Sequence, residues 1–81
     1  MIAKSDLEHL LKEDQEQRII ARLSEITGLP LRDTMGLYYR SRLAKQLEAG
    51  EYGMQYLDYK YLAEDLLEHE PELFGNVREN A

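Results

Sequence analysis

The sequence contains no cysteine and no tryptophan. Without cysteine the chain has no disulfide, no thiol nucleophile and no cysteine-based zinc site. A chain of 81 residues is also short, and a domain of this size buries only about 60% of the surface that its unfolded chain exposes. We therefore expect its stability to depend on helix packing or on association with another chain.

Long apolar runs are missing as well. The longest uninterrupted apolar run has three residues, whereas a membrane-spanning helix needs about 20. Residues 1–20 carry eight charged side chains, which leave no place there for the apolar core of a signal peptide. We therefore predict a cytoplasmic protein without a membrane partner.

Proline and glycine are scarce, with two and five residues respectively. They stand where helix ends are expected, because glycine accepts the left-handed conformation after a helix and proline cannot continue one. These signals, with a capping box at Ser5–Glu8 and an N-cap at Asp58, predict three helices with a connector at 51–57: residues 5–27 before Gly28 and Pro30, residues 32–49 before Gly50, and residues 59–69 before Pro71.

No segment shows the alternating pattern of a strand, so the predicted fold class is all-α. We expect one domain over residues 1–75, built from three helices and a short C-terminal turn that places Phe74 on the core. Residues 76–81 are predicted to form a flexible tail. In the third helix, a buried stripe is expected at Tyr59, Leu62, Ala63, Leu66 and Leu67.

The first helix carries two apolar stripes on different sides. At 100° per residue, Leu7, Leu10 and Leu11 point to one side, while Ile19, Leu23 and Ile26 point to nearly the opposite side. Residues 12–18 between the stripes contain no apolar side chain. Either the helix breaks near Glu13–Gln17 or its first turns pack on another element or chain. We favour one long helix with a self-association surface at the three leucines.

The second helix has a four-residue apolar repeat, which assigns Met35, Tyr39, Leu43 and Leu47 to the core. The other side of this helix carries Tyr38, Ser41, Arg42 and Lys45. Tyrosine is enriched at protein interfaces, and all six tyrosines lie within residues 38–61. We interpret this mixed aromatic and basic face, together with Tyr61, as a partner-binding site. The alternative is that these side chains cover the rim of the core or are solvated.

Groups suited to catalysis or metal binding are few. The two histidines, His9 and His69, have Asp6 and Asp65 at helical spacing, but no further ligand pair accompanies them. The carboxylate pairs have no apolar cleft to raise a pKa, and no phosphate loop or dinucleotide motif is present. We therefore predict no enzyme activity, no cofactor and no metal.

The net charge of −6 is unevenly distributed. Residues 28–50 carry +2, whereas residues 1–27 carry −2 and residues 51–81 carry −6. The basic segment either faces the acidic C-terminal segment of its own chain, which we favour, or binds nucleic acid through Arg32, Arg40, Arg42 and Lys45. Nucleic acid is the less favoured partner, because its phosphate backbone repels a chain that is acidic overall.

A set of short motifs resembles a diffuse family of short bacterial helical proteins of unknown function. The motifs span about residues 19–70 and comprise Ile26-Thr27-Gly28-Leu29-Pro30, Met35, Tyr38-Tyr39, Ser41, Leu43, Gly50, Gly53-Met54, Tyr61-Leu62 and Glu64. Those proteins tend to have a serine or aspartate cap where this chain has Leu31. The resemblance implies a bacterial, helical and cytoplasmic protein and transfers no catalytic residue.

Together these patterns predict a small acidic helical module for protein–protein interaction or regulation, without catalytic activity. Its expected partners are another protein or a second copy of the chain. A nucleic-acid-associated regulator is the alternative.

Overall fold

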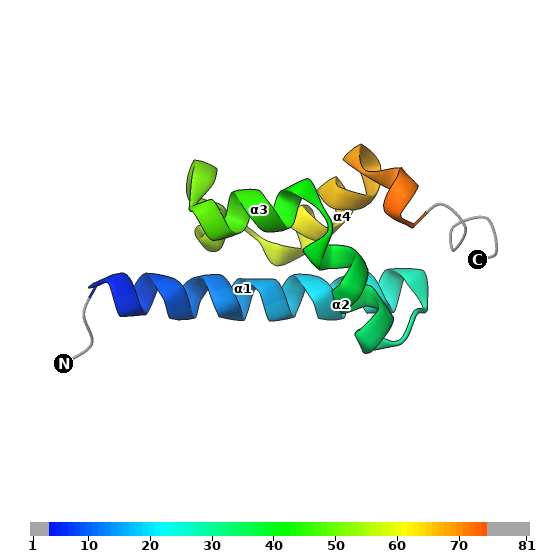
Figure 1. Cartoon of the computed structure of the whole chain (residues 1–81), viewed down its shortest axis with the longest axis horizontal. Coiled ribbons are helices and arrows are strands. Elements are labelled where there is room, and N and C mark those ends of the chain that lie inside the picture. Colours follow the sequence, from blue (N-terminus) through cyan, green and yellow to red (C-terminus); the bar gives the residue numbers. More distant parts are fainter. Residues whose placement is uncertain (1–3, 75–81) are drawn as a thin grey trace.

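The computed structural model describes residues 4–74, and Figure 1 shows the arrangement of this part. Its elements are α1 (Lys4–Thr27), α2 (Leu31–Tyr39), α3 (Arg42–Ala49), the 3-10 helix η1 (Glu51–Tyr56), α4 (Tyr59–His69) and the 3-10 turn η2 (Pro71–Leu73). The predicted all-α class is confirmed, with no strand in the described part. Four α-helices replace the three predicted, and the predicted tail at 76–81 lies outside the described residues.

The helix α1 is continuous through the charged stretch at Glu13–Gln17, so no break occurs there. It begins at Lys4, which places Ser5 inside the helix instead of at its N-cap. Its C-terminal end is as predicted: Gly28 adopts φ 77°, and its N–H donates to the Ser24 carbonyl over 2.9 Å. Figure 1 shows α1 extending at its N-terminal end beyond the rest of the fold.

The prediction of one continuous helix over residues 32–49 is wrong, because the helix is interrupted at Arg40–Ser41. Ser41 is extended (φ −82°, ψ 157°), and its hydroxyl accepts from the Ala44 N–H over 3.1 Å. The same hydroxyl donates to the Tyr38 carbonyl over 2.6 Å. Serine satisfies free N–H groups at a helix start better than it supports a helix interior. Ser41 therefore ends α2 and caps α3.

The first turn of α3 has a second cap from a distant part of the chain. Glu70, which follows α4, accepts from the backbone N–H groups of Arg42 over 2.9 Å and Leu43 over 3.3 Å. Its side chain is almost completely buried. A carboxylate suits a helix N-terminus because the unpaired N–H groups there carry partial positive charge. Glu70 thus ties the end of α4 to the start of α3.

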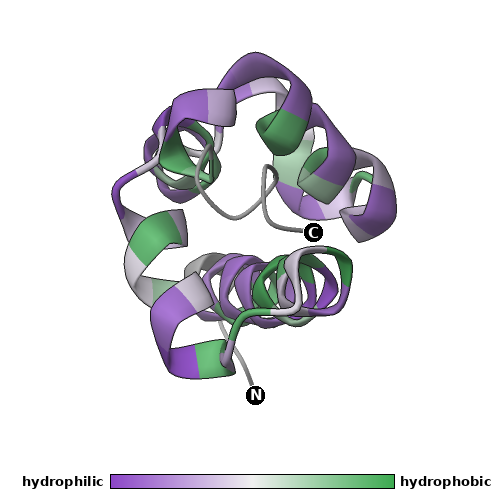
Figure 2. Ribbon diagram, turned by 90° about the vertical axis from the view of Figure 1, so that its right-hand side faces the viewer, coloured by the Kyte–Doolittle hydropathy of each residue, from purple (hydrophilic) through white to green (hydrophobic). Residues whose placement is uncertain are grey.

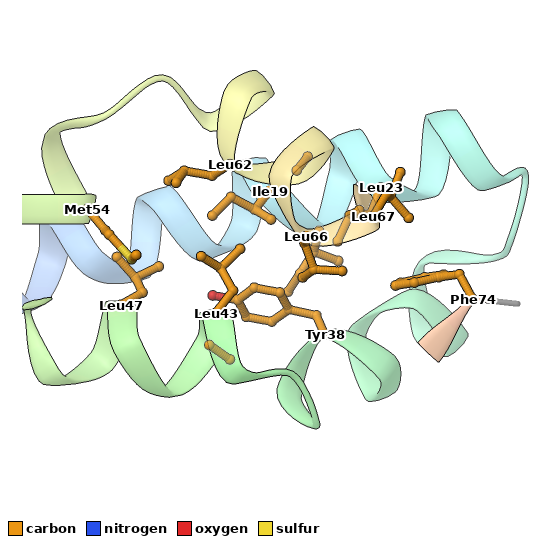
Figure 3. Packing of buried hydrophobic residues seen from close by; sticks show 13 residues of the cluster. Ile19, Leu23, Tyr38, Leu43, Leu47, Met54, Leu62, Leu66, Leu67 and Phe74 are labelled. Atoms are coloured by element: carbon orange, nitrogen blue, oxygen red, sulfur yellow. The ribbon is translucent and has the colours of Figure 1, made fainter. Parts of the chain in front are cut away.

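The core lies between α1 and the pair α3 and α4, with α2 closing one side (Figures 1 and 2). In Figure 2 much of the outer ribbon is hydrophilic, although α2 also carries apolar ribbon on its outer side. Tyr38 reaches into the middle of the cluster, near Leu43 and Leu66 (Figure 3). The buried apolar residues are Ile19, Ile20, Leu23, Tyr38, Leu43, Ala44, Leu47, Met54, Leu62, Ala63, Leu66, Leu67 and Phe74.

The predicted stripe of α4 is confirmed, with Tyr59 packed at its edge, and Asp58 caps this helix by accepting from the Lys60 N–H over 2.9 Å. Phe74 is fully buried, as predicted. Sequence patterns did not identify Gln15, whose side-chain nitrogen donates to the carbonyls of Met54 and Leu57. These bonds fasten the connector between α3 and α4 onto α1.

Candidate protein-docking surface

Two short apolar stripes remain exposed on the fold, and we call them together the outer face. The first stripe is formed by Leu7 and Leu10, whose side of α1 is turned away from Ile19 and Leu23 in the core. Leu11, predicted with them, is only partly exposed. The second stripe runs along α2 at four-residue steps. The exposed fractions are 50% for Leu7, 50% for Leu10, 53% for Leu31, 36% for Met35 and 49% for Tyr39.

The α2 stripe corrects the sequence prediction, which assigned Met35 and Tyr39 to the core. The break at Ser41 changes the phase of the apolar repeat between α2 and α3. Tyr38 is consequently buried in place of Tyr39, while Leu43 and Leu47 are buried as expected. Leu31 was not predicted as part of a surface, although its spacing from Met35 gave the signal.

A groove beside Tyr39 joins α1 to α2. One hollow of about 380 Å³ is lined by Leu10, Gln17, Tyr39 and the acidic residues Glu13, Asp14 and Glu16. A second hollow of about 580 Å³ is lined by Tyr39, Lys12, His9 and the acidic residues Glu8, Glu13, Glu16 and Glu48. The hollows share Glu13, Glu16 and Tyr39, so we treat them as one acidic groove.

The neighbouring tyrosines have different roles in this groove. The ring of Tyr39 meets that of Tyr38 edge to face, with 5.3 Å between centroids and 70° between planes. The Tyr38 hydroxyl donates to Glu16 over 3.3 Å. The ring of the buried Tyr38 therefore packs against that of Tyr39, and its hydroxyl orients Glu16. The ring of Tyr39 is half exposed.

The groove has strong negative potential. Five carboxylates line it against one ammonium, that of Lys12, and Lys12 is already engaged, since it donates to the Glu48 carbonyl over 3.2 Å. Burial raises the pKa of Glu16, and Glu48 and Glu13 add to the rise. Burial and then the charges of Glu16, Glu13 and Glu48 raise the pKa of Tyr39.

Two carboxylates of the groove have partners on α1. Glu13 lies 3.0 Å from the His9 ring, and Asp14 receives a 2.8 Å ion pair from Arg18. Both pairs are solvent-exposed, where such contacts contribute at most about 1 kcal/mol. Cationic groups of a binding partner could therefore replace these weak contacts.

The partner site predicted from sequence does not form as one face. Tyr38 and Ser41 are fully buried, so their predicted exposure is wrong; the N-cap role of Ser41 is the physical reason. Arg42, Lys45 and Tyr61 are exposed. The Arg42 guanidinium donates to the His69 carbonyl over 3.1 Å and lies 3.8 Å from Glu70. Arg42 thus faces acidic residues of its own chain.

A separate hollow of about 290 Å³ lies between α3 and α4. Its polar lining is explained by structural contacts, because Glu70 caps α3 and the His69 ring lies 2.9 Å from the Asp65 carboxylate. A hydrogen bond to the Asp65 backbone and the charge of Asp65 raise the pKa of His69. Among residues 4–74 no group of three or more histidine and acidic side chains is arranged to hold a metal.

None of the described helices combines the length and the apolar character needed to cross a bilayer. Comparisons with protein-family models, curated proteins and solved structures gave no match to this chain. The resemblance to short bacterial helical proteins accordingly stays a prediction.

Proposed function

We propose that this protein is a non-catalytic module that binds another protein through its outer face. The observation that carries the proposal is the exposure of Leu7 and Leu10 on a helix whose other half is fully buried at Ile19 and Leu23. Burying a leucine side chain completely contributes about 1.5–3 kcal/mol, so the exposed half of each leucine leaves roughly 1 kcal/mol for a partner.

The continuity of the surface supports the same proposal. The acidic groove connects Leu10 to Tyr39, and the α2 stripe continues from Tyr39 to Met35 and Leu31. Isolated exposed apolar residues are normal, whereas clustered ones rimmed by polar groups are typical of protein-binding sites. A regulatory role would follow from occupancy of this surface.

Self-association through Leu7, Leu10 and Leu11 is a second proposal for the same region. Exposed leucines at the projecting end of α1 favour it, because a second copy could cover them. The carboxylates beside Leu10 weigh against it, since pairing two copies there would bring like charges together. Sedimentation velocity between about 10 and 500 µM distinguishes the two: a concentration-dependent dimer that Leu10→Ser abolishes supports self-association, and a monomer throughout rejects it.

The nucleic-acid alternative remains a proposal with less support. Of the four basic residues that it uses, Arg42 contacts Glu70 and His69, and the neighbouring Tyr38 is buried and offers no ring for base stacking. Arg32, Arg40 and Lys45 remain exposed. Binding that falls steeply with salt would favour this alternative.

Affinity capture from host-cell lysate tests the main proposal when it compares three proteins: wild type, Leu7→Ser/Leu10→Ser and Tyr56→Ser. Tyr56 is an exposed residue of η1 outside the outer face and provides the control. We expect one dominant protein, resistant to nuclease, with wild type and the control but not with the leucine variant. Equal capture by all three rejects the outer face as the site, and loss of binding after nuclease treatment favours nucleic acid. Circular dichroism checks that each variant is folded.

A further inference from the structure

We propose that the partner presents a basic amphipathic helix, whose apolar side packs on Leu10 and Tyr39 and whose lysine or arginine side chains enter the acidic groove. This inference rests on the proposed function and adds the chemistry of the partner. It follows from three properties of the described surface: its shape, its charge and the position of one aromatic ring.

The shape fits an elongated ligand. The two hollows of about 380 and 580 Å³ meet at Tyr39 and are lined from α1, α2 and the end of α3. Amphipathic helices bind in such grooves between helices and are held by apolar anchors at helical spacing. Leu10 on α1 and Tyr39 on α2, which line the same hollow, supply apolar contacts for such anchors.

The charge selects a cationic partner. Glu8, Glu13, Asp14, Glu16 and Glu48 surround Tyr39, and the only ammonium lining the two hollows is the Lys12 group bound to the Glu48 carbonyl. These carboxylates would repel an acidic helix, whereas a basic one would gain specificity and a faster association rate.

Tyr39 adds a specific site for one cation. Its ring is half exposed, and the carboxylates of Glu13 and Glu16 line both hollows beside it. A guanidinium or ammonium over an aromatic face is attracted by the ring, and nearby carboxylates strengthen that attraction. Burial first, and then the neighbouring carboxylates, raise the pKa values of Glu16 and Tyr39 at this point.

The probe for this inference is a fluorescein-labelled 18-residue peptide of leucine and lysine in an amphipathic helical pattern. A leucine–glutamate peptide of the same pattern is the control ligand. Fluorescence anisotropy in 50 to 300 mM NaCl gives the affinities, and amide chemical-shift mapping on the full chain gives the location. We expect saturable binding of the lysine peptide with shifts around Leu10 and Tyr39, and no binding of the glutamate peptide.

Two double variants separate the groove from general acidity. Glu13→Gln/Glu16→Gln and Glu64→Gln/Glu68→Gln remove the same charge, but Glu64 and Glu68 lie on the exposed side of α4. We expect the first to weaken the lysine peptide at least fivefold and the second less than twofold. Equal effects, or shifts spread over all acidic surfaces, show attraction without a site and overturn the inference.

The outcome is separable from that of the proposed function. If the lysine peptide fails to bind while lysate capture still depends on Leu7 and Leu10, the partner binds there by other chemistry and only this inference is wrong. If capture is also insensitive to the leucines, the proposed function is wrong as well.

Discussion

The two halves of α1 place the same kinds of residue in opposite surroundings. In the C-terminal half Ile19, Ile20 and Leu23 are completely buried, whereas Leu7 and Leu10 in the N-terminal half are half exposed. The helix is continuous between them, so helix formation does not distinguish the halves. The difference lies in what packs on each half: α2, α3 and α4 pack on the second, whereas the first turns of α1 extend beyond them (Figure 1). Apolar content alone therefore does not identify core.

The largest expected effect comes from leucine truncation in each half. Leu23→Ala should lower the free energy of unfolding by about 3 kcal/mol, because it removes buried contacts and leaves a cavity. Leu10→Ala should change it by less than about 0.5 kcal/mol, as is usual for exposed positions. Urea denaturation followed by circular dichroism measures both. Similar losses in the two variants would mean that the N-terminal half is covered in solution, as by a second copy.

The contrast between buried and exposed positions can also be tested with two carboxylates at the end of α4. Glu70→Ala should destabilise the fold by about 2 kcal/mol, since it leaves N–H groups of the first turn of α3 without their acceptor. Glu68→Ala, at an exposed position nearby, should stay within about 0.5 kcal/mol of wild type. Thermal unfolding of the pair provides the comparison. No loss in Glu70→Ala would contradict the capping role assigned to that residue.

Gln15 lies between the two halves of α1, and its substitution tests where the packed half begins. Removing its amide in Gln15→Ala takes the side-chain donor from the Leu57 carbonyl and leaves the Met54 carbonyl with the Leu57 N–H alone, and we expect a loss of about 1–2 kcal/mol. Gln17→Ala, an exposed change on the same helix, is the matched control. Hydrogen exchange should also show faster opening of the η1 region in Gln15→Ala only. Unchanged exchange there would indicate that other contacts hold the connector.

The smallest expected effect is a pH dependence at Glu16. Its pKa is raised in the folded protein, so the folded state binds the proton more readily than the unfolded chain. The resulting stability is fully present below the unfolded pKa and is lost as pH rises through the folded pKa. Glu16→Gln should flatten the stability profile at pH values above the ordinary glutamate pKa of about 4.3.

Tyr38→Phe should have the opposite effect on the pH dependence of stability. The Tyr38 hydroxyl donates to Glu16 and lowers the pKa of that carboxyl. Its removal should therefore raise the Glu16 pKa further and make stability depend more steeply on pH. Denaturant unfolding at a series of pH values measures both variants. Changes of the same sign in the two variants would contradict the assigned role of the Tyr38–Glu16 contact.

Several features of the chain were predictable because their causes are local. Gly28 with Pro30 ends α1, Asp58 starts α4, and the apolar repeat of α4 identifies its buried side, each through signals within a few residues. The exposed direction of Leu7 and Leu10 also followed from helical periodicity. Ser41 offered a local cap signal too, but the four-residue repeat through Tyr39 and Leu43 was read as one uninterrupted helix.

The sequence by itself determined the helical class, most helix ends and the conflict between the two stripes of α1, because capping, backbone restriction and periodicity act over one or two turns. Only the tertiary structure decided that Tyr38 is buried and Tyr39 exposed, that Glu70 caps α3, and that Gln15 holds the connector. These outcomes depend on contacts between residues that are far apart in sequence, 28 residues for Glu70 with Arg42 and 39 for Gln15 with Met54, which local patterns do not encode. The acidic groove arises in the same way, from carboxylates of α1 and α3 brought together around a tyrosine of α2.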